Sequence, residues 1–457
     1  MADLCPVEKN KEYIMSVTDI GNDGEGIGHI EGFAVFVKDA LPGEKIRVKI
    51  TKANKKLAYG RLMEIIEHSE YRTEPECPVF KRCGGCSLQH LSYEAQLDFK
   101  TKKVKDALMR IGGFKNPQVK DAFGMDKPYF YRNKAQFPVR KGNQGVDIGF
   151  YAKRSHDIVN IDSCMIQNSI NDKVIKIVRE YITEENIEPY DEISGKGLIR
   201  HIVTRIGHVT GEVIVCIVVN GSSIPKKNKL VEKLLCIDGI KGILLNVNKK
   251  NTNVILSDIT KVLWGRDYII DYIGDIKFQI SINSFYQVNP VQTNFLYSRA
   301  MELAGLTGNE NVLDIYCGIG TISLFLARKA KKVIGVEIVE KAIEDAKRNA
   351  KLNNINNAEF IAGPAEKIIS EVYSNGFMAD VVIVDPPRKG CDINVINTII
   401  EMMPKRVVYV SCDPSTLARD LKILSDNGYS IGEAEPVDQF CHTTHVETVV
   451  LMSRVQK

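Results

Sequence analysis

Two short segments near the C-terminal end carry side chains that suit covalent chemistry. VVIVDPPRKG contains Asp385, and VVYVSCDPS contains Cys412. Each is a run of β-branched residues that stops at a polar tip, which is typical of a buried strand in a parallel sheet. Ligands of such sheets bind beyond the carboxyl ends of the strands. The two segments therefore predict a carboxylate and a thiol at one edge of an open α/β sheet.

A glycine turn upstream predicts a nucleotide-type cofactor site. NVLDIYCGIGTISLFLA reads as a strand, a CGIGT turn and a helix. Ser323 takes the place of the third glycine of the dinucleotide fingerprint. Glu337 ends the next strand about 20 residues further on, where a ribose diol would bind. The combination favours S-adenosylmethionine over NAD, because its sulfonium and amino-acid groups pair with carboxylates such as Asp314 and Asp385.

A methyl transfer that needs a cysteine points to carbon 5 of a pyrimidine. That carbon becomes nucleophilic only after a thiolate has added to carbon 6. A base must then remove the hydrogen from carbon 5 so that the thiol can leave. Cys412 is the predicted nucleophile, and Glu447 in HVETVV is the predicted base, while Cys317 and Cys441 are weaker rivals for the nucleophile. The addition is the same for uracil and cytosine, so this chemistry leaves the base open.

A separate group of cysteines has the spacing of a metal or cluster site. ECPVFKRCGGCSLQH places Cys77, Cys83 and Cys86 in a C-x5-C-x2-C pattern. A closed tetrahedral or cubane site needs a fourth ligand, and Cys164 in IDSCMIQ is the obvious candidate. Spacing alone leaves zinc and an iron–sulfur cluster both open.

The composition is that of a reduced globular protein. The chain has 457 residues, of which 44% are hydrophobic and 26% charged, and its net charge is +4. It has no apolar run long enough to cross a bilayer and no signal-peptide pattern. The odd count of 11 cysteines argues against a disulfide framework. We therefore expect a cytoplasmic protein without a membrane partner, and a monomer by default.

Positive charge gathers in the N-terminal quarter. Residues 45–61 include seven lysines or arginines and no acidic residue, and a second basic stretch runs from Lys100 to Arg110. One such run is usually a solvated face. Two of them in this quarter favour contact with a phosphate backbone.

Four parts are predicted along the chain. Their periodicities indicate a multidomain α/β protein with a small N-terminal all-β unit, a central α+β region and a C-terminal Rossmann-like doubly wound domain. The N-terminal unit resembles an OB-like β-barrel. The predicted parts are the barrel at 9–67, the cysteine segment at 68–110, the central region at 111–282 and the doubly wound domain at 283–457.

Taken together, these motifs resemble the bacterial RNA uracil-C5 methyltransferases, in the branch that modifies 23S ribosomal RNA and carries an iron–sulfur cluster. The resemblance covers nearly the whole chain. It rests on a TRAM-like GNDGEGIGHIEGFAVFVKDALPGEKIRVKI stretch and on CGGC, FYQVNP, LDIYCGIGT, GVEI, DPPRKG, SCDP and HVET. It implies that S-adenosylmethionine methylates carbon 5 of a uridine in RNA through a covalent cysteine adduct.

The resemblance also implies roles for individual residues. It implies Cys412 as the nucleophile and Glu447 as the proton acceptor, with Arg132 and Asn133 in the RNA-facing central region. It implies cofactor contacts from Gln287, Tyr316, Glu337 and Asp385, and a 4Fe–4S cluster on Cys77, Cys83, Cys86 and Cys164.

Other functions stay open from the sequence. Transfer RNA is the alternative substrate, and the number and position of the modified uridines are not determined. A radical S-adenosylmethionine enzyme would use C-x3-C-x2-C with an open iron, whereas a fourth cysteine would close the site here. A cytosine-C5 enzyme and a non-catalytic RNA-binding assembly factor are the remaining alternatives.

Overall fold

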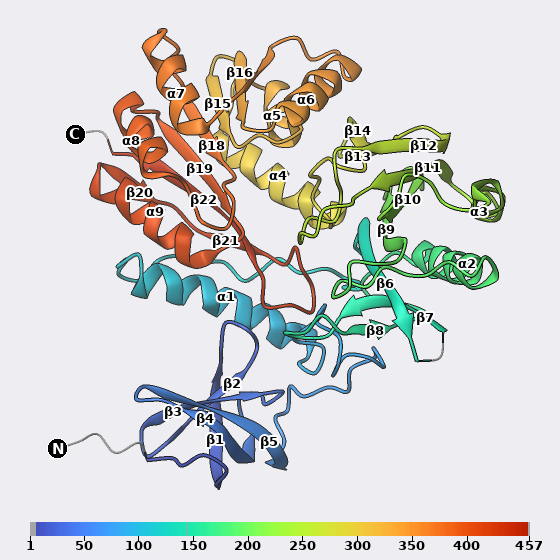
Figure 1. Cartoon of the computed structure of the whole chain (residues 1–457). Helices are drawn as coiled ribbons and strands as arrows, with labels where there is room; N and C mark the ends of the chain where they lie inside the picture. Colours follow the sequence, from blue (N-terminus) through green and yellow to red (C-terminus); the bar gives the residue numbers. More distant parts are fainter. Residues whose placement is uncertain (1–5, 144, 456–457) are drawn as a thin grey trace.

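The computed structural model describes residues 6–143 and 145–455. Figure 1 shows a β-barrel at one end, a methyltransferase-like α/β region at the other, and a central sheet beside them. Within the described part of the chain, no helix combines the length and apolar character needed to cross a membrane.

The N-terminal unit is a closed five-stranded barrel in the order β1-β2-β3-β5-β4. Its strands alternate buried and exposed positions, so that a compact apolar core including Val35, Val37 and Ile46 fills the interior. The strands are β1 (Glu12–Ile20), β2 (Gly26–Ile30), β3 (Phe33–Lys38), β4 (Lys45–Ala53) and β5 (Leu57–Glu67).

The central region is built on a seven-stranded sheet in the order β12-β11-β10-β9-β6-β7-β8. β10 and β11 pair in parallel, and the other neighbours are antiparallel. Two helices, α2 (Ile170–Glu184) and α3 (Lys227–Leu234), share its apolar core. The strands are β6 (Lys134–Gly142), β7 (Gly145–Tyr151), β8 (Ile158–Asn160), β9 (Ile199–Ile206), β10 (Val213–Val219), β11 (Ile240–Val247) and β12 (Thr260–Gly265).

The C-terminal region is an eight-stranded sheet in the order β17-β16-β15-β18-β19-β22-β20, with β21 paired to β22. The first five strands in this order are parallel, whereas β22 runs antiparallel to β19. The strands are β15 (Asn311–Ile315), β16 (Lys332–Glu337), β17 (Ala358–Ala362), β18 (Val381–Val384), β19 (Arg406–Ser411), β20 (Tyr429–Ile431), β21 (Glu435–Val437) and β22 (Glu447–Arg454).

Helices cover both faces of this sheet. Successive residues of β18 point to opposite faces: Val381 and Ile383 join one core, and Val382 and Val384 join the other. One face packs against α4 (Pro290–Ala304), α5 (Thr321–Ala327) and α6 (Glu340–Leu352). The other packs against α7 (Ala365–Ser374), α8 (Ile393–Met402) and α9 (Pro414–Asp426). A hairpin of β13 (Tyr268–Ile273) and β14 (Ile276–Ser281) adjoins α6.

Helix α1 (Tyr93–Arg110) belongs to the same core although it precedes that region by almost two hundred residues. Val104 and Leu108 of α1 are fully buried among side chains of α8 and α9. On sequence grounds this stretch was grouped with the cysteine segment, but its packing is with the methyltransferase-like region. The predicted fold class, a β-barrel followed by α+β and doubly wound regions, is confirmed.

Candidate active site

The antiparallel strand β22 brings Cys412 and Glu447 together. Ser411, the last residue of β19, pairs with Thr448 in β22. Cys412 follows Ser411 and Glu447 precedes Thr448, so the two side chains come to one edge of the sheet and line the same cavity. In a wholly parallel sheet the start of the last strand would lie at the opposite edge, so the reversal of β22 is what places a carboxylate beside the thiol.

The residues that follow β19 end the strand and leave Cys412 at the edge of the sheet. The Asp413 carboxylate caps α9 by accepting hydrogen bonds from the backbone N–H groups of Ser415 (2.8 Å) and Thr416 (3.1 Å). Pro414 occupies the first helical turn, where its missing N–H costs nothing. The SCDP motif therefore fixes Cys412 in the short turn between a buried strand and a capped helix.

The glycine turn after β15 forms the floor of the cofactor site. Tyr316 has a left-handed φ of 70°, and the N–H groups of Tyr316 and Cys317 both donate to the Val336 carbonyl. Glu337, at the tip of β16, accepts from the backbone N–H of Gly318 at 3.3 Å and of Val339 at 3.0 Å. These bonds hold the Glu337 carboxylate beside the turn, as ribose recognition requires.

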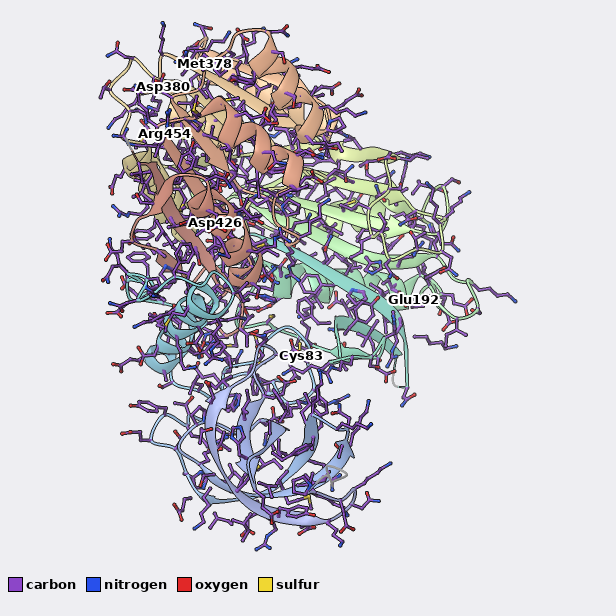
Figure 2. The ribbon with its side chains drawn as sticks, turned by 90° about the vertical axis from the view of Figure 1, so that its left-hand side faces the viewer. Cys83, Glu192, Met378, Asp380, Asp426 and Arg454 are labelled. Atoms are coloured by element: carbon purple, nitrogen blue, oxygen red, sulfur yellow. The ribbon has the colours of Figure 1, made fainter. Side chains whose placement is uncertain are left out.

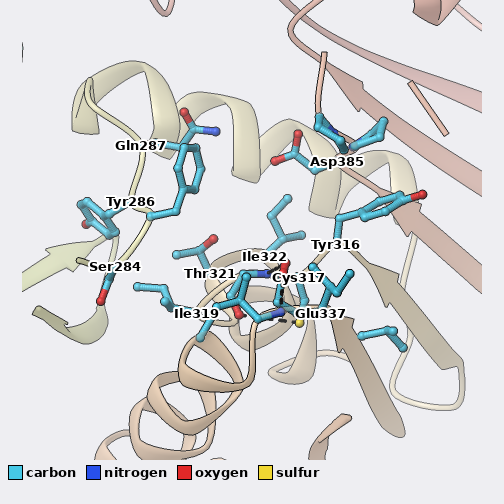
Figure 3. Close-up of a pocket in the computed structure, with 18 of the residues that line it drawn as sticks. Ser284, Tyr286, Gln287, Tyr316, Cys317, Ile319, Thr321, Ile322, Glu337 and Asp385 are labelled. Atoms are coloured by element: carbon cyan, nitrogen blue, oxygen red, sulfur yellow. Dashed lines mark hydrogen bonds between the residues drawn. The ribbon is translucent and has the colours of Figure 1, made fainter. Parts of the chain in front are cut away.

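One cavity of about 1030 Å³ collects the predicted active-site residues. Figure 3 shows Gln287 and Tyr286 on one side and Tyr316, Glu337 and Asp385 on the other. The predicted residues that line it are Gln287, Tyr316, Glu337, Asp385, Cys412 and Glu447. Six residues from separate segments of the chain thus meet in one space large enough for a nucleoside-sized cofactor and a base.

Buried carboxylates dominate the electrostatics of this cavity. Burial raises the pKa of Asp314 to about 7, although Ser323 donates a hydrogen bond to it. Burial also raises the pKa values of Asp385 and Glu447, and in Glu447 the charge of Asp385 adds to the effect. Among residues 6–143 and 145–455, no group forms a hydrogen bond with Glu447 Oε2. Such carboxylates suit proton transfer and the binding of a cationic ligand.

Burial raises the pKa of the Cys412 thiol to about 12, and the nearby charges of Glu447 and Asp385 add to the effect. Arg388 opposes it and is the cation that favours the thiolate. Sequence reasoning did not assign Arg388 a role, although it lies within the quoted DPPRKG motif. It also missed Tyr297, Phe440 and His445, which line the same cavity and carry no distinctive sequence signal.

The two rival cysteines are poorly placed for attack on a base. Cys317 lies under the glycine turn, where burial raises its pKa well above the ordinary value. Cys441 is fully buried, 3.5 Å from Met125 Sδ, and does not line the active-site cavity. The geometry therefore favours Cys412 among the three.

The four predicted ligand cysteines line a second cavity, of about 360 Å³. Figure 2 places Cys83 at the junction between the barrel and the rest of the chain. Burial raises the pKa of Cys86 to about 12, with contributions from Cys164, Cys83 and Cys77. Nevertheless, no group of three or more His, Cys, Asp or Glu side chains in residues 6–143 and 145–455 forms a metal site as it stands.

The second basic stretch does not act as one charged face. Lys100 is fully buried in an ion pair with Asp438, and Lys103 donates to the Thr444 carbonyl at 2.9 Å. The prediction that this whole stretch meets a phosphate backbone is therefore wrong for Lys100. The charge of Lys100 instead neutralises the buried carboxylate of Asp438.

Comparison with known proteins identifies the class and then the family. The sheet order and the glycine turn define an α/β methyltransferase. Residues 92–455 match the family described as tRNA (Uracil-5-)-methyltransferase, and residues 6–63 match the TRAM domain. The chain therefore belongs to the tRNA (uracil-5-)-methyltransferase family.

Individual relatives agree with this assignment. The chain is 53% identical to an uncharacterized RNA methyltransferase of Bacillus cereus, covering 99% of this chain and 98% of the relative. It is 52% identical to another from Clostridium acetobutylicum over 100% of both chains. The Pyrococcus abyssi tRNA (uracil-54, C5)-methyltransferase in complex with S-adenosyl-L-homocysteine is 30% identical, with a TM-score of 0.79 over 96% of this chain and 100% of that one.

The protein is thus an S-adenosylmethionine-dependent RNA methyltransferase of the uracil-C5 class. Family membership settles the base, which the addition chemistry alone left open. It also sets aside the radical enzyme, the cytosine enzyme and the non-catalytic RNA-binding factor.

Asp314→Asn should flatten the dependence of stability on pH. The folded pKa of about 7 exceeds the ordinary value of 3.8, so the folded state holds a proton that the unfolded chain releases in this range. The resulting stabilisation is complete below the lower value and is lost as the pH rises through the higher one. A shift of this size is equivalent to at most about 4 kcal/mol.

Melting temperatures of the cofactor-free protein near pH 5 and near pH 8 provide the measurement. We expect the wild type to lose several degrees more than Asp314→Asn, whose amide oxygen can still accept the Ser323 hydrogen bond. Equal losses in both proteins would contradict the assignment.

Proposed function

We propose that this enzyme methylates carbon 5 of a uridine in 23S ribosomal RNA through a covalent adduct with Cys412. The observation that carries the chemistry is that Cys412 and Glu447 line one carboxylate-rich cavity and lie close enough for the charge of Glu447 to raise the pKa of the Cys412 thiol. Its cellular setting would be the cytoplasm, where reduced cysteines persist, and we expect a monomer.

Two residues carry the chemistry in this proposal. The Cys412 thiolate adds to carbon 6 of the uracil, which makes carbon 5 nucleophilic. S-Adenosylmethionine, when bound, supplies the methyl group. Glu447 then takes the hydrogen from carbon 5; the electrons of that C–H bond form the carbon 5–carbon 6 double bond, and the carbon 6–sulfur bond breaks to release the thiolate. A raised Glu447 pKa suits it to hold the proton it has removed.

Four residues would hold the cofactor. Glu337 is placed for the ribose hydroxyls, and Gln287, Tyr316 and Asp385 line the remaining walls. Asp314 is fully buried next to the glycine turn, and Asp385 and Glu337 are close enough for their charges to raise its pKa, so its charge would add to the attraction of a cationic cofactor. The donor set fits S-adenosylmethionine better than a phosphate-rich dinucleotide.

We also propose a 4Fe–4S cluster held by Cys77, Cys83, Cys86 and Cys164. All four thiols line one cavity, and the donor set contains sulfur alone. Four thiolates are the donor set of a 4Fe–4S cubane, and a zinc ion is the alternative that metal analysis distinguishes.

A third cavity, of about 1430 Å³, provides a path for RNA between the barrel and the active site. Phe36, Tyr59 and Lys52 occupy one row across β3, β5 and β4, and the two rings are 5.7 Å apart. His445 lines both this groove and the active-site cavity. Aromatic rings beside a cation suit the stacking of unpaired bases.

Replacing the target uridine by 5-fluorouridine should trap the enzyme. Fluorine cannot leave as a proton, so the adduct cannot break down. Mass spectrometry of the enzyme incubated with S-adenosylmethionine and substituted 23S fragments should find the RNA attached at Cys412. Cys412→Ala should form no adduct, and Cys236→Ser, an exposed cysteine far from the site, should behave as wild type. Methylation of natural RNA without any adduct would refute the covalent mechanism.

The choice of RNA can be tested with Glu447→Gln. Loss of the base should leave the methylated adduct intact, so the variant should retain its own substrate from unmodified total RNA. We expect sequencing of the captured RNA to return 23S ribosomal RNA. Capture of transfer RNA would favour the alternative suggested by the Pyrococcus abyssi enzyme, and would leave the chemistry unchanged.

Anaerobic purification should yield about four iron and four acid-labile sulfide per chain, as expected for a cubane on four cysteines. Cys86→Ser should lose most of this iron, and Cys236→Ser should retain it. One zinc ion per chain and no sulfide would contradict the cluster proposal.

Tyr59→Ala should weaken binding only of RNA long enough to reach the barrel. Stacking is worth about 1–3 kcal/mol per base, so KM for a long fragment should rise about 5- to 160-fold, while KM for a fragment trimmed to the target loop should not change. Tyr71→Ala removes an exposed tyrosine outside the groove and is the matched control. Equal effects on both fragments would exclude this path.

A further inference from the structure

The loop that precedes Glu447 has an unusual amount of buried polar support. Residues 438–446 connect β21 to β22, and within them Phe440 and His445 line the active-site cavity. Glu447 itself has an oxygen without a hydrogen-bond partner, so no side-chain bond fixes that oxygen. Its position therefore depends on the backbone on either side: the β19–β22 register after it and this loop before it.

Helix α1 holds the loop with a stripe of polar side chains. Tyr93, Gln96, Lys100 and Lys103 are spaced three, four and three residues apart, which places them on one face of the helix. Each contacts the loop. The contacts are Tyr93 Oη to Asp438 Oδ2 at 2.7 Å, His442 N–H to Gln96 Oε1 at 3.2 Å, Lys100 Nζ to the Phe440 carbonyl at 3.1 Å, and Lys103 Nζ to the Thr444 carbonyl at 2.9 Å.

The centre of this stripe is an ion pair that water does not reach. Lys100 and Asp438 are both fully buried and bond directly to each other. Further along α1, the buried residues are Val104, Ala107 and Leu108, which are apolar. A buried ion pair is seldom more stabilising than apolar side chains of the same volume. The presence of this pair where α1 meets the loop therefore indicates a role in positioning the loop.

The cysteine segment also holds this loop, next to Gln96 of α1, which donates to the Leu88 carbonyl. The backbone N–H groups of Ser87 and Leu88 donate to the His442 carbonyl at 2.9 and 3.0 Å. His442 has a left-handed φ of 64°, and Tyr129 stacks on its ring with centroids 4.5 Å apart. The loop is therefore held in a conformation that a free chain would seldom adopt.

We propose that Gln96 and the Lys100–Asp438 pair are positioning residues that place Glu447 for removal of the carbon 5 proton. The proposal rests on the function proposed above. Addition of Cys412 to carbon 6 does not use Glu447, whereas elimination does. Displacement of the loop should therefore slow release of the product from the enzyme and leave formation of the adduct almost unchanged.

The test compares adduct formation with adduct release in a single turnover on natural RNA. Gln96→Leu removes an amide without leaving a buried charge, and Lys100→Met/Asp438→Asn removes both charges together. Denaturing gels would follow the covalent RNA–enzyme band over time, and melting temperatures would report folding. Lys102→Met removes an exposed lysine of the same helix, paired to Asp19 and Asp106, and is the control.

Both loop variants should release product at least about tenfold more slowly, since a small misplacement of a catalytic group costs on the order of 100-fold. Their rates of adduct formation should stay within about twofold of wild type, because the addition of Cys412 to carbon 6 does not use Glu447. Lys102→Met should release product at the wild-type rate. Slower formation and release in equal measure, or a loss of stability alone, would overturn the positioning role.

Glu447→Gln separates this inference from the proposed function. Accumulation of its methylated adduct, together with normal release by the loop variants, would refute only the inference. Absence of any adduct in Glu447→Gln would instead refute the role proposed for Glu447.

Discussion

The reversed strand β22 is the constraint on which the site depends. In a parallel sheet all strands end at one edge and begin at the opposite edge. By running antiparallel to β19, β22 begins where β19 ends, so Glu447 enters the site from a strand start and Cys412 from a strand end. The predicted nucleophile and base therefore lie next to one backbone ladder, and the hydrogen-bond register of β19 and β22 contributes to their relative position together with the loop before Glu447.

The residues around Cys412 and Glu447 determine the charge of the site as well as its shape. Asp314, Asp385 and Glu447 are all held where burial raises the pKa, and Arg388 is the cation that acts on both Cys412 and Glu447. Without a ligand these groups are costly to bury. A positively charged cofactor offsets that cost, and the same low-polarity setting allows proton transfer at carbon 5.

Contacts between distant parts of the chain hold the site in place. Helix α1 packs in the methyltransferase core, and its polar stripe meets the loop before Glu447. The cysteine segment meets the same loop at His442, and the barrel opens onto a groove that ends at His445. Helix α1, the cysteine segment and the groove beside the barrel thus all reach residues 438–446.

The sequence alone was enough to identify the strand tips, the glycine turn and the class of fold, because these follow from short-range patterns: β-branched runs, turn glycines and helix caps. It also singled out Cys412 and Glu447 through local motifs. It could not reveal the role of Lys100, which the charge pattern assigns to a basic surface stretch. It also could not reveal the roles of Arg388 and His442. Their roles depend on partners up to 340 residues away, such as Phe440 for Lys100. Burial and pairing are properties of the folded chain, and no local pattern encodes which charge a lysine will meet.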